Sequence, residues 1–484
     1  MVRPPVSDSI CIRCKGARLL CGKKSCPILK KASILKSTVP FNYKKVQRNK
    51  TLFGASPPAV FVGRYGYPNV NIGPMIPVDE IFLQDKLQIS KKDTGLLDIS
   101  ELWYGKSLDD IITFRTSMVR SNFKVNIQQG INQTGGPRLL RDVRRKLTSG
   151  DNRLLDSTQE LAMSKISVDT ETKFSKLRVN LSYDVHSPPV GPSGITEKID
   201  VVDNIKAHPK VEYVVDDRDL KAADAIFDYL YPTSITNDRV KDPSLSRVVT
   251  GTEMQRLLSA GLLGSKNKRK IVPTRWSITA VDSIISKKLA KQIKRFPEIN
   301  QYFTFHQEYL DNNFVILMIP GPWSYEMMEV WNADTIWTQV VPGIQPAIRN
   351  REPQIVQDYE MEHGRKTYAD NVTGAYYAAR KEVTEFLYLN RRQARVIVFR
   401  EVSGGYIVPL GVWVIRETVR KGLENGFQGD NVIKHDNLPS ALAVVRDHFN
   451  VPLSDWLHAS KLLSNIRKQR RLDEWIEFKP RKIA

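Results

Sequence analysis

The only cysteines in this 484-residue chain lie close together near its N-terminal end: Cys11, Cys14, Cys21 and Cys26. Their spacing is C-x2-C-x6-C-x4-C, and a Cys-x-x-Cys turn places two thiolates on one metal ion, while a second close pair completes the tetrahedral shell that zinc prefers. Gly16 and Gly22 each follow a cysteine closely, where glycine lets backbone N–H groups turn towards sulfur. A segment this short cannot bury a core, so metal binding would supply its folding free energy. The pattern therefore predicts one zinc ion held by four thiolates.

Three other uses of these cysteines compete with zinc: two disulfides, an iron–sulfur cluster, or four ordinary thiols in a basic arm. No signal peptide is recognisable, so we expect a reducing compartment in which disulfides do not persist. The cysteine spacings of ferredoxins do not match. Zinc is the preferred interpretation, and ordinary thiols are the remaining alternative.

The cysteines lie in a strongly basic segment. Residues 1–50 hold thirteen Lys and Arg against one acid, Asp8, so +12 of the whole chain's net charge of +21 is concentrated there. Folding around zinc would hold part of this charge as a fixed surface, formed by Lys15, Arg18, Lys23, Lys24, Lys30 and Lys31. Such a surface fits the phosphate backbone of nucleic acids, whereas a solvated tail is the alternative.

The rest of the sequence has the composition of a globular protein. It is 41% hydrophobic and 9% aromatic over the whole chain, and it is long enough for two or three domains. We expect a zinc-binding basic module at 1–51, an α/β or α+β body of one or two subdomains at 52–460, and a flexible tail at 461–484.

A pI near 9.6 indicates a polyanionic partner, which is DNA, RNA or an acidic membrane surface. The longest apolar run, Phe314 to Pro322, is too short to span a bilayer, so we expect no membrane-spanning segment.

A stretch rich in glycine, proline and aromatic residues runs from Ser56 to Pro77. Its residues 60–62 read as a short buried strand, and Gly63-Arg-Tyr-Gly66 reads as a turn with bare backbone. Arg64, Tyr65 and Tyr67 are therefore candidates for holding a phosphate or stacking a base. The alternative is a loop that packs over a core.

The clearest amphipathic helix follows residue 277. Its apolar positions recur at steps of three and four residues, and they are Ile278, Val281, Ile285, Leu289 and Ile293. Ser277 or Thr279 can cap this helix, which places Arg275 and Trp276 just before its N-terminus, where anions bind and a ring can stack. The alternative is a buried Trp276 with Arg275 paired to an acid.

Two acidic groups raise the question of a catalytic metal. The first contains Asp216, Asp217, Asp219, Asp224 and Asp228. Paired carboxylates can hold Mg²⁺ for a nuclease, but acids at the start of a helix more often complement its dipole and cap its N–H groups. The second group, 358–363, precedes Gly364 as a loop would. No Walker A, G-x-G-x-x-G or HExxH motif is found, so no catalytic residue is assigned and enzymatic activity stays an open question.

The patterns also predict further elements. Helices are expected at 139–164 (two, broken near Gly150), 219–229, 375–389 and 438–468. Strands are expected at 176–185 and 211–215, one or two at 302–319, and a pair at 395–399 and 406–415 joined by a glycine turn.

The C-terminal residues resemble a sliding-clamp interacting peptide, whose pattern is Gln, two residues, an aliphatic, two residues and two aromatics. Gln469, Leu472 and Trp475 match this pattern, whereas Ile476 departs from it. One helical turn would bring the three apolar side chains to one side as an anchor, with Gln469 in a polar pocket. The alternative is an ordinary terminal amphipathic turn.

Taken in order, the cysteine knuckle, GRYGYPNVNIGP, PTRWSITAVDS and the clamp-like tail resemble the archaeal Nre family of DNA repair proteins. The resemblance runs from about Cys11 to Ile476 and implies a soluble archaeal protein, cytoplasmic and nucleoid-associated, that responds to DNA damage through the clamp PCNA. It implies no catalytic mechanism. A nuclease or nucleotide-processing enzyme acting on DNA, and an RNA-binding factor, are the alternative functions.

Overall fold

The structure of the chain, a computed structural model, describes residues 50–77, 89, 94–130, 153–178, 197–207, 220–231, 250–265, 268–332, 355–404, 406, 410–429 and 431–468. Several predicted sites lie outside these residues: Cys11, Cys14, Cys21 and Cys26, the arm residues Lys15, Arg18, Lys23, Lys24, Lys30 and Lys31, the acids Asp216, Asp217 and Asp219, and the tail residues Gln469, Leu472, Trp475 and Ile476. Those assignments stay predictions, as does the strand expected at 211–215.

The fold is mixed α/β, and the chain divides into two units. Among the described residues, the N-terminal unit comprises those within 50–285 and 410–413, and the C-terminal unit comprises those within 286–406 and 414–468. The division falls within helix α11 (Thr274–Ile293). Each unit contains its own β-sheet, so each is described separately below.

The N-terminal unit is built on a seven-stranded sheet of order β1-β6-β7-β4-β3-β2, with β5 paired to β3. Its strands are β1 (Thr51–Ser56), β2 (Val60–Val62), β3 (Asn69–Pro77), β4 (Met118–Arg120), β5 (Phe123–Asn126), β6 (Val168–Arg178) and β7 (Glu197–Ala207). The pairs are antiparallel except for β4 with β7. The predicted strand at 60–62 is confirmed, whereas the strand expected at 176–185 is wrong in its bounds because β6 begins at Val168.

Four α-helices precede α11 in the described part of this unit. They are α5 (Leu108–Thr116), α7 (Arg153–Met163), α8 (Ala222–Leu230) and α10 (Gly251–Ser259), accompanied by the short 3₁₀ helices η2 (Thr94–Leu97), η3 (Ser100–Leu102) and η4 (Ile127–Gly130). Helices α5 and α10 each start with a capping box, Ser107 with Asp110 and Thr250 with Glu253, in which the two side chains satisfy each other's backbone N–H groups. Helix α7 packs on β3 and β7, and its Leu155 and Leu161 are buried.

The C-terminal unit is a six-stranded sheet between two layers of helices. The strand order is β11-β10-β12-β9-β8-β13, and only the β10–β12 pair is parallel. The strands are β8 (Tyr302–Tyr309), β9 (Asn312–Ile319), β10 (Ser324–Trp331), β11 (Val356–Glu360), β12 (Arg395–Val402) and β13 (Val432–His435). The helices are α12 (Gly374–Leu389), α13 (Trp413–Leu423), α14 (Leu438–His448), α15 (Leu453–Ala459) and α16 (Lys461–Lys468), with the 3₁₀ helix η6 (Gly426–Gln428).

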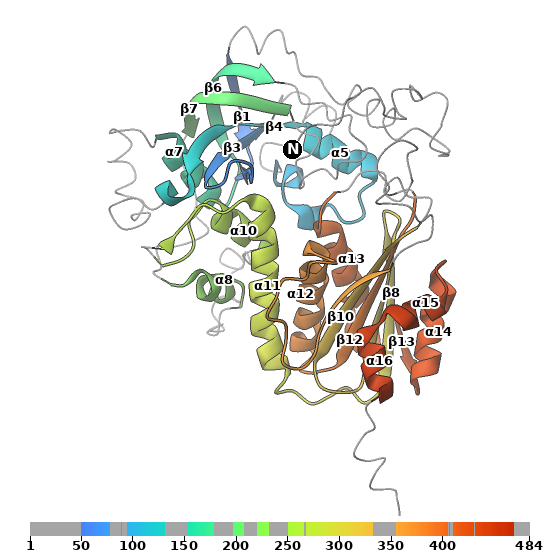
Figure 1. Cartoon of the computed structure of the whole chain (residues 1–484). Coiled ribbons are helices and arrows are strands. Elements are labelled where there is room, and N and C mark those ends of the chain that lie inside the picture. The colour runs from blue at the N-terminus through green and yellow to red at the C-terminus, as the bar shows by residue number, and fades with distance from the viewer. Residues whose placement is uncertain are drawn as a thin grey trace, which may run out of the picture. The chain divides into compact units, whose positions relative to one another are not determined.

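Successive side chains of a strand point to opposite faces of the six-stranded sheet, and different helices pack on the two faces. Val315, Leu317 and Ile319 of β9 pack with α14, α15 and α16 in one hydrophobic cluster that includes the buried Trp456. On the opposite face, the Phe305 ring meets Phe386 of α12 at a centroid distance of 5.4 Å. Figure 1 shows α12 and α13 on one side of this sheet and α14, α15 and α16 on the other. The unit is therefore a three-layer α/β/α arrangement with a core on each face.

Four expectations for this unit can be compared with the structure. The predicted strand at 406–415 is wrong, because residues from Trp413 onward form α13 and β12 pairs with β9 and β10 instead. The single helix expected at 438–468 is three helices, interrupted at residues 449–452 and at Ser460. The helix expected at 375–389 and the strands expected at 302–319 are confirmed as α12, β8 and β9.

Among the helices that the structure describes, none combines the length and the apolar composition needed to cross a bilayer.

Candidate nucleic-acid interface

The turn between β2 and β3 lies beside the first residues of α11, within the N-terminal unit. The Thr274 hydroxyl accepts a hydrogen bond from the Val62 backbone N–H at 2.9 Å, and it lies 3.1 Å from the Ser259 hydroxyl. The first residue of α11 is therefore hydrogen-bonded to the last residue of β2. This contact brings two stretches together that are about 200 residues apart in the sequence, and sequence patterns gave no sign of it.

Exposed aromatic rings gather where these two stretches meet. The rings of Tyr67 and Trp276 are in tilted contact, with centroids 5.3 Å apart. Tyr65 is 69% exposed, Tyr67 50% and Trp276 45%. The Arg64 guanidinium lies over the Tyr65 ring, 5.2 Å from its centroid. We name the five residues Arg64, Tyr65, Tyr67, Arg275 and Trp276 the aromatic platform.

The structure corrects the predicted position of Arg275 and Trp276. Helix α11 begins at Thr274, so both residues lie in its first turn and not before it. The Ser277 hydroxyl donates to the Thr274 carbonyl inside the helix and does not cap its start. The alternative of a buried Trp276 is also wrong, since the side chain is exposed, and among the described residues Arg275 makes no ion pair with a carboxylate.

The predicted amphipathic face of α11 is largely confirmed. Val281, Ile285, Leu289 and Ile293 are buried, whereas Ile278 is only half-buried. Burial of these positions fixes the rotation of the helix about its own axis. With that rotation, Arg275 and Trp276 are presented to solvent.

Backbone hydrogen bonds hold the β2–β3 turn. The Gly63 N–H donates to the Asn71 carbonyl at 2.7 Å, and the Asn69 N–H donates to the Gly66 carbonyl at 2.8 Å. Gly66 has a φ of 85°, and a Cβ there would lie 2.8 Å from the Asn69 carbonyl oxygen, so only glycine fits without displacement. Backbone hydrogen bonds and Gly66 thus closely determine the path of the turn that carries the rings of Tyr65 and Tyr67. The Tyr67–Pro68 peptide bond within this turn is cis.

The stretches of sequence around the platform carry positive charge and contain no carboxylate. The stretches 50–77, 121–130 and 268–281 contain no Asp or Glu. They are joined by backbone bonds from Ile127 N–H to the Pro68 carbonyl at 3.0 Å and from Ile271 N–H to the Ile127 carbonyl at 3.1 Å. Exposed Lys124, Lys268 and Lys270 belong to these stretches. With Arg64 and Arg275, they give this part of the unit the charge that phosphate groups require.

The acidic group at 358–363 serves the fold of the C-terminal unit. Asp358 forms an ion pair with Arg365 at 3.0 Å and accepts hydrogen bonds from the backbone N–H groups of Asn371 and Val372. Glu360 pairs with Arg380 at 2.6 Å and accepts from the Trp323 indole. Both carboxylates are buried in β11 and are occupied by cations and donors, which explains them without a metal.

The acids on α8 give no metal cluster either. Asp224 lies in the first turn of α8, where a carboxylate complements the helix dipole, and Asp228 is exposed. Among the residues that the structure describes, no three His, Cys, Asp or Glu side chains come close enough to hold a metal ion.

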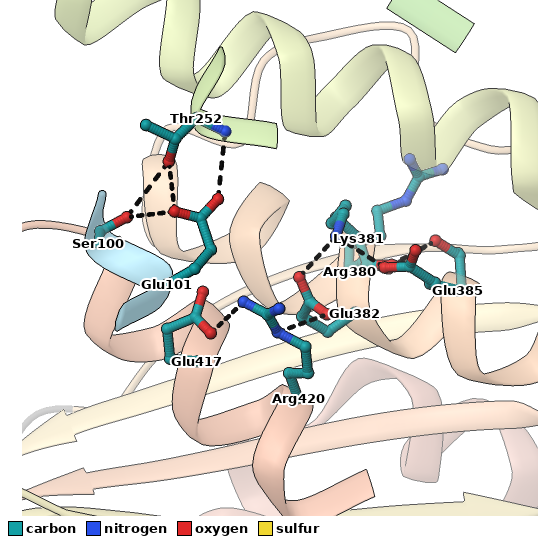
Figure 2. A network of polar contacts seen from close by, with 10 residues as sticks. Ser100, Glu101, Thr252, Arg380, Lys381, Glu382, Glu385, Glu417 and Arg420 are labelled. Atoms are coloured by element: carbon teal, nitrogen blue, oxygen red, sulfur yellow. Dashed lines mark hydrogen bonds and ion pairs between the residues drawn. The ribbon is translucent and has the colours of Figure 1, made fainter. Parts of the chain in front are cut away.

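Sequence reasoning missed two polar networks, drawn together in Figure 2. In the C-terminal unit, Lys381 of α12 bridges Glu382 at 2.9 Å and Glu385 at 2.7 Å, and Arg420 of α13 pairs with Glu417 and lies 3.8 Å from Glu382. Burial raises the pKa of the Glu382 carboxyl, and Lys381 opposes that shift. The spacing of Lys381 with Glu385 and of Glu417 with Arg420 was a signal for such pairs on helices.

The second network lies wholly in the N-terminal unit. Glu101 of η3 accepts hydrogen bonds from the Thr252 backbone N–H at 3.2 Å and from the Thr252 hydroxyl at 2.7 Å (Figure 2). Ser100 lies 3.4 Å from the same hydroxyl. A carboxylate at the start of α10 stabilises that helix end, so we interpret this network as structural.

The described residues thus define a two-unit mixed α/β protein with an exposed basic and aromatic surface on its N-terminal unit. A family model described as "Archaeal Nre, N-terminal" matches residues 20–338, and one described as "Archaeal Nre, C-terminal" matches residues 360–475. The chain therefore belongs to the archaeal Nre family, which confirms the resemblance seen in the sequence.

Three curated relatives extend over most of the chain. DNA repair protein NreB of Archaeoglobus fulgidus is 34% identical over 468 residues, covering 96% of this chain and 100% of the relative. DNA repair protein NreA of the same organism is 32% identical, covering 86% of this chain and 88% of the relative. DNA repair protein NreA of Haloferax volcanii is 28% identical, covering 88% and 89%. No solved structure matches the chain.

Proposed function

We propose that this protein takes part in DNA repair, binding DNA and being recruited to it by the sliding clamp PCNA. The observation that carries the repair role is the likeness to a DNA repair protein over 96% of this chain and the whole of that relative. A match that covers both chains end to end makes a shared role the simplest interpretation. The protein would act at the nucleoid, within the cytoplasm.

Two features of the chain support contact with DNA. The basic segment 1–50 carries a net charge of +12, and the aromatic platform adds exposed rings and two arginines. Lysine and arginine neutralise phosphates and release counterions, which supplies most of the sequence-independent affinity of proteins for nucleic acid. The proposal assigns no catalytic step, because the described carboxylates at 358 and 360 are bound in structural pairs.

The basic segment would be shaped by zinc. Four cysteine thiolates are the donor set of a closed structural zinc site, with no open coordination position for chemistry. Bound to zinc, Cys11, Cys14, Cys21 and Cys26 would hold Lys15, Arg18, Lys23 and Lys24 as one surface.

We therefore expect elemental analysis of the purified protein to give one zinc per chain. Cys14→Ser should remove most of this zinc, because three ligands hold the ion much less tightly than four. Ser25→Ala, in the same segment but not a ligand, should leave the zinc content unchanged. Zinc-free intact protein, or full zinc content in Cys14→Ser, would refute the site.

The clamp motif begins at Gln469, directly after the last residue of α16. Leu462 and Leu463 of α16 are buried in the C-terminal unit, so that helix is held by the body up to Lys468. Leu472, Trp475 and Ile476 would then enter a hydrophobic pocket of the clamp as one anchor.

Trp475→Ala should lower the affinity for the clamp roughly thirtyfold, because truncating a central aromatic in an interface commonly costs about 2 kcal/mol or more. Calorimetric titration of the full chain with purified clamp measures this loss. Phe478→Ala removes an aromatic outside the motif spacing and should leave the affinity within twofold. If Trp475→Ala instead lowers the melting temperature while clamp binding persists, the segment belongs to the body and the recruitment proposal fails.

A further inference from the structure

We propose that the aromatic platform holds single-stranded DNA by stacking unpaired bases on Tyr65, Tyr67 and Trp276. The inference rests on the proposed contact with DNA and adds to it the form of DNA that is recognised. It concerns a surface of the N-terminal unit alone, away from the predicted basic arm and the clamp motif in the sequence.

The first observation is the clustering of open rings. Six aromatic side chains are exposed among the described residues, namely Phe53, Tyr65, Tyr67, Trp276, Tyr359 and Tyr368, and three of them form the platform. Single exposed aromatics are ordinary, but a group of them on one surface marks a place of interaction. Tyr67 and Trp276 cover each other only in part, since their planes are inclined at 53° and both remain about half exposed.

The second observation is the charge around these rings. Arg64 and Arg275 belong to the platform itself, exposed Lys124 and Lys270 lie on the stretches bonded to it, and those stretches contain no carboxylate. The first turn of the 20-residue helix α11 adds the partial positive charge of the N-terminal end of the helix dipole. A ligand that fits must offer flat apolar faces and negative charge together, and an unpaired nucleic acid strand offers both.

Duplex DNA fits this surface less well. In a duplex the faces of the bases are covered by their neighbours, so the rings of Tyr65, Tyr67 and Trp276 would find only phosphates and sugars. In a single strand each base has a free face, and stacking on an aromatic ring stabilises the complex whatever the base sequence. The rings therefore contribute to binding only where bases are unpaired.

The third observation is that backbone contacts hold the segments that carry the rings. Gly66 and the hydrogen bonds at Gly63 and Asn69 define the turn that carries the tyrosines, and the Thr274 hydroxyl bonds β2 to the start of α11. A surface ordered in advance loses little conformational entropy on binding, so more of the stacking free energy appears as affinity. A surface held in this way is better suited to binding a DNA strand than an ordinary exposed loop is.

The test compares three ligands of one length at one salt concentration: an oligo(dT) strand, the corresponding abasic strand and a mixed-sequence duplex. Binding of the full chain is followed by anisotropy of the labelled DNA. Trp276→Ala and Tyr65→Ala should each weaken oligo(dT) binding about tenfold and leave the abasic strand and the duplex within twofold of the wild type. Tyr65 is 69% exposed, and among the described residues the one ring or cation contact of its side chain is with Arg64, so we expect its removal to leave the fold intact.

One control variant matches Tyr65→Ala. Tyr368→Ala removes a tyrosine that is 46% exposed and belongs to the C-terminal unit, outside the platform. This control should bind oligo(dT) like the wild type. Quenching of tryptophan fluorescence by oligo(dT), absent in Trp276→Ala, would show the stacking directly.

Unchanged oligo(dT) binding in both platform variants would overturn the inference, and so would an equal loss on the abasic strand, which has no bases to stack. Tenfold tighter binding of oligo(U) through the same residues would overturn the assignment to DNA. Neither result touches the proposed function as long as the wild type binds DNA. Failure of the wild type to bind any of the three ligands would instead refute the proposed DNA contact itself.

Discussion

Thr373 turns the chain into α12 with backbone angles that β-branched residues rarely adopt. Its φ is 60° and its ψ is −131°, in a region that favours glycine. The cause lies in the two residues before it, whose N–H groups both donate to the buried Asp358 carboxylate, at 2.9 Å for Asn371 and 2.8 Å for Val372. Because these two residues are held to β11 by hydrogen bonds, the change of chain direction into α12 takes place at Thr373.

We expect Thr373→Gly to raise the free energy of unfolding by about 1 kcal/mol, because glycine adopts these angles without a Cβ clash. Thr367→Gly, also exposed but without a positive φ, should lower stability by about 0.5 kcal/mol or more through the flexibility that glycine adds to the unfolded chain. Chemical denaturation measures both. A loss of stability in Thr373→Gly would mean that the threonine side chain makes a stabilising interaction that exceeds the strain.

Single residues of the candidate site can be picked out in the sequence, but their convergence cannot. Arg64, Tyr65 and Tyr67 stand out as arginine and aromatic residues of a turn rich in glycine and proline, and Arg275 and Trp276 stand out at the start of an amphipathic helix. Periodicity gives no information about contacts between segments 200 residues apart, so the hydrogen bond from Val62 to Thr274 could only come from the structure.

At the scale of elements, a buried carboxylate ties the C-terminal helices to their sheet. Glu401 of β12 accepts hydrogen bonds from the backbone N–H groups of Asn450 and Val451, from the Asn450 side chain at 2.7 Å and from the Asn332 side chain at 2.8 Å. Asn450 and Val451 form the connection between α14 and α15. This connection therefore has its polar groups satisfied by the sheet.

Glu401→Gln should lower the free energy of unfolding by about 1–3 kcal/mol. The amide NH₂ group that replaces one carboxylate oxygen is a donor, so it would face other donors and could not accept their hydrogen bonds. Glu362→Gln, an exposed glutamate of the same unit, should change stability by less than about 0.5 kcal/mol. Thermal unfolding of the three proteins compares them. Equal stability of Glu401→Gln and the wild type would show that this carboxylate does not hold the connection.

Helices with a clear apolar pattern were predicted well. Segments whose structure depends on which strands pair in the sheet were not. The apolar steps of α11 and the residues of α12 gave their helices correctly. The apolar residues at 412–415 read as strand because they form a short run, whereas in the fold they begin an amphipathic helix. A short apolar run fits both structures, and only the neighbours of β12 in the sheet decide between them.

At the scale of the whole molecule, charge is distributed unevenly along the chain. The first fifty residues hold more than half of the net charge of +21, with +12. We propose that this segment supplies long-range, salt-sensitive attraction to DNA, whereas the aromatic platform supplies contacts that depend on unpaired bases. The two contributions differ in their response to salt, so they can be separated by experiment.

The most direct test of the central claim is the salt dependence of DNA affinity for the full chain and for a chain lacking residues 1–50. Each phosphate neutralised contributes roughly −0.9 to the slope of log K against log salt for duplex DNA and roughly −0.7 for single strands. We expect the full chain to bind DNA with a steep slope, and the deletion to flatten it by about 2 or more. Lys23→Gln with Lys24→Gln, which keeps all four cysteines, should flatten it by a smaller amount in the same direction. An unchanged slope after deletion would contradict the role of the basic segment, and absence of DNA binding by the full chain at low salt would contradict the account as a whole.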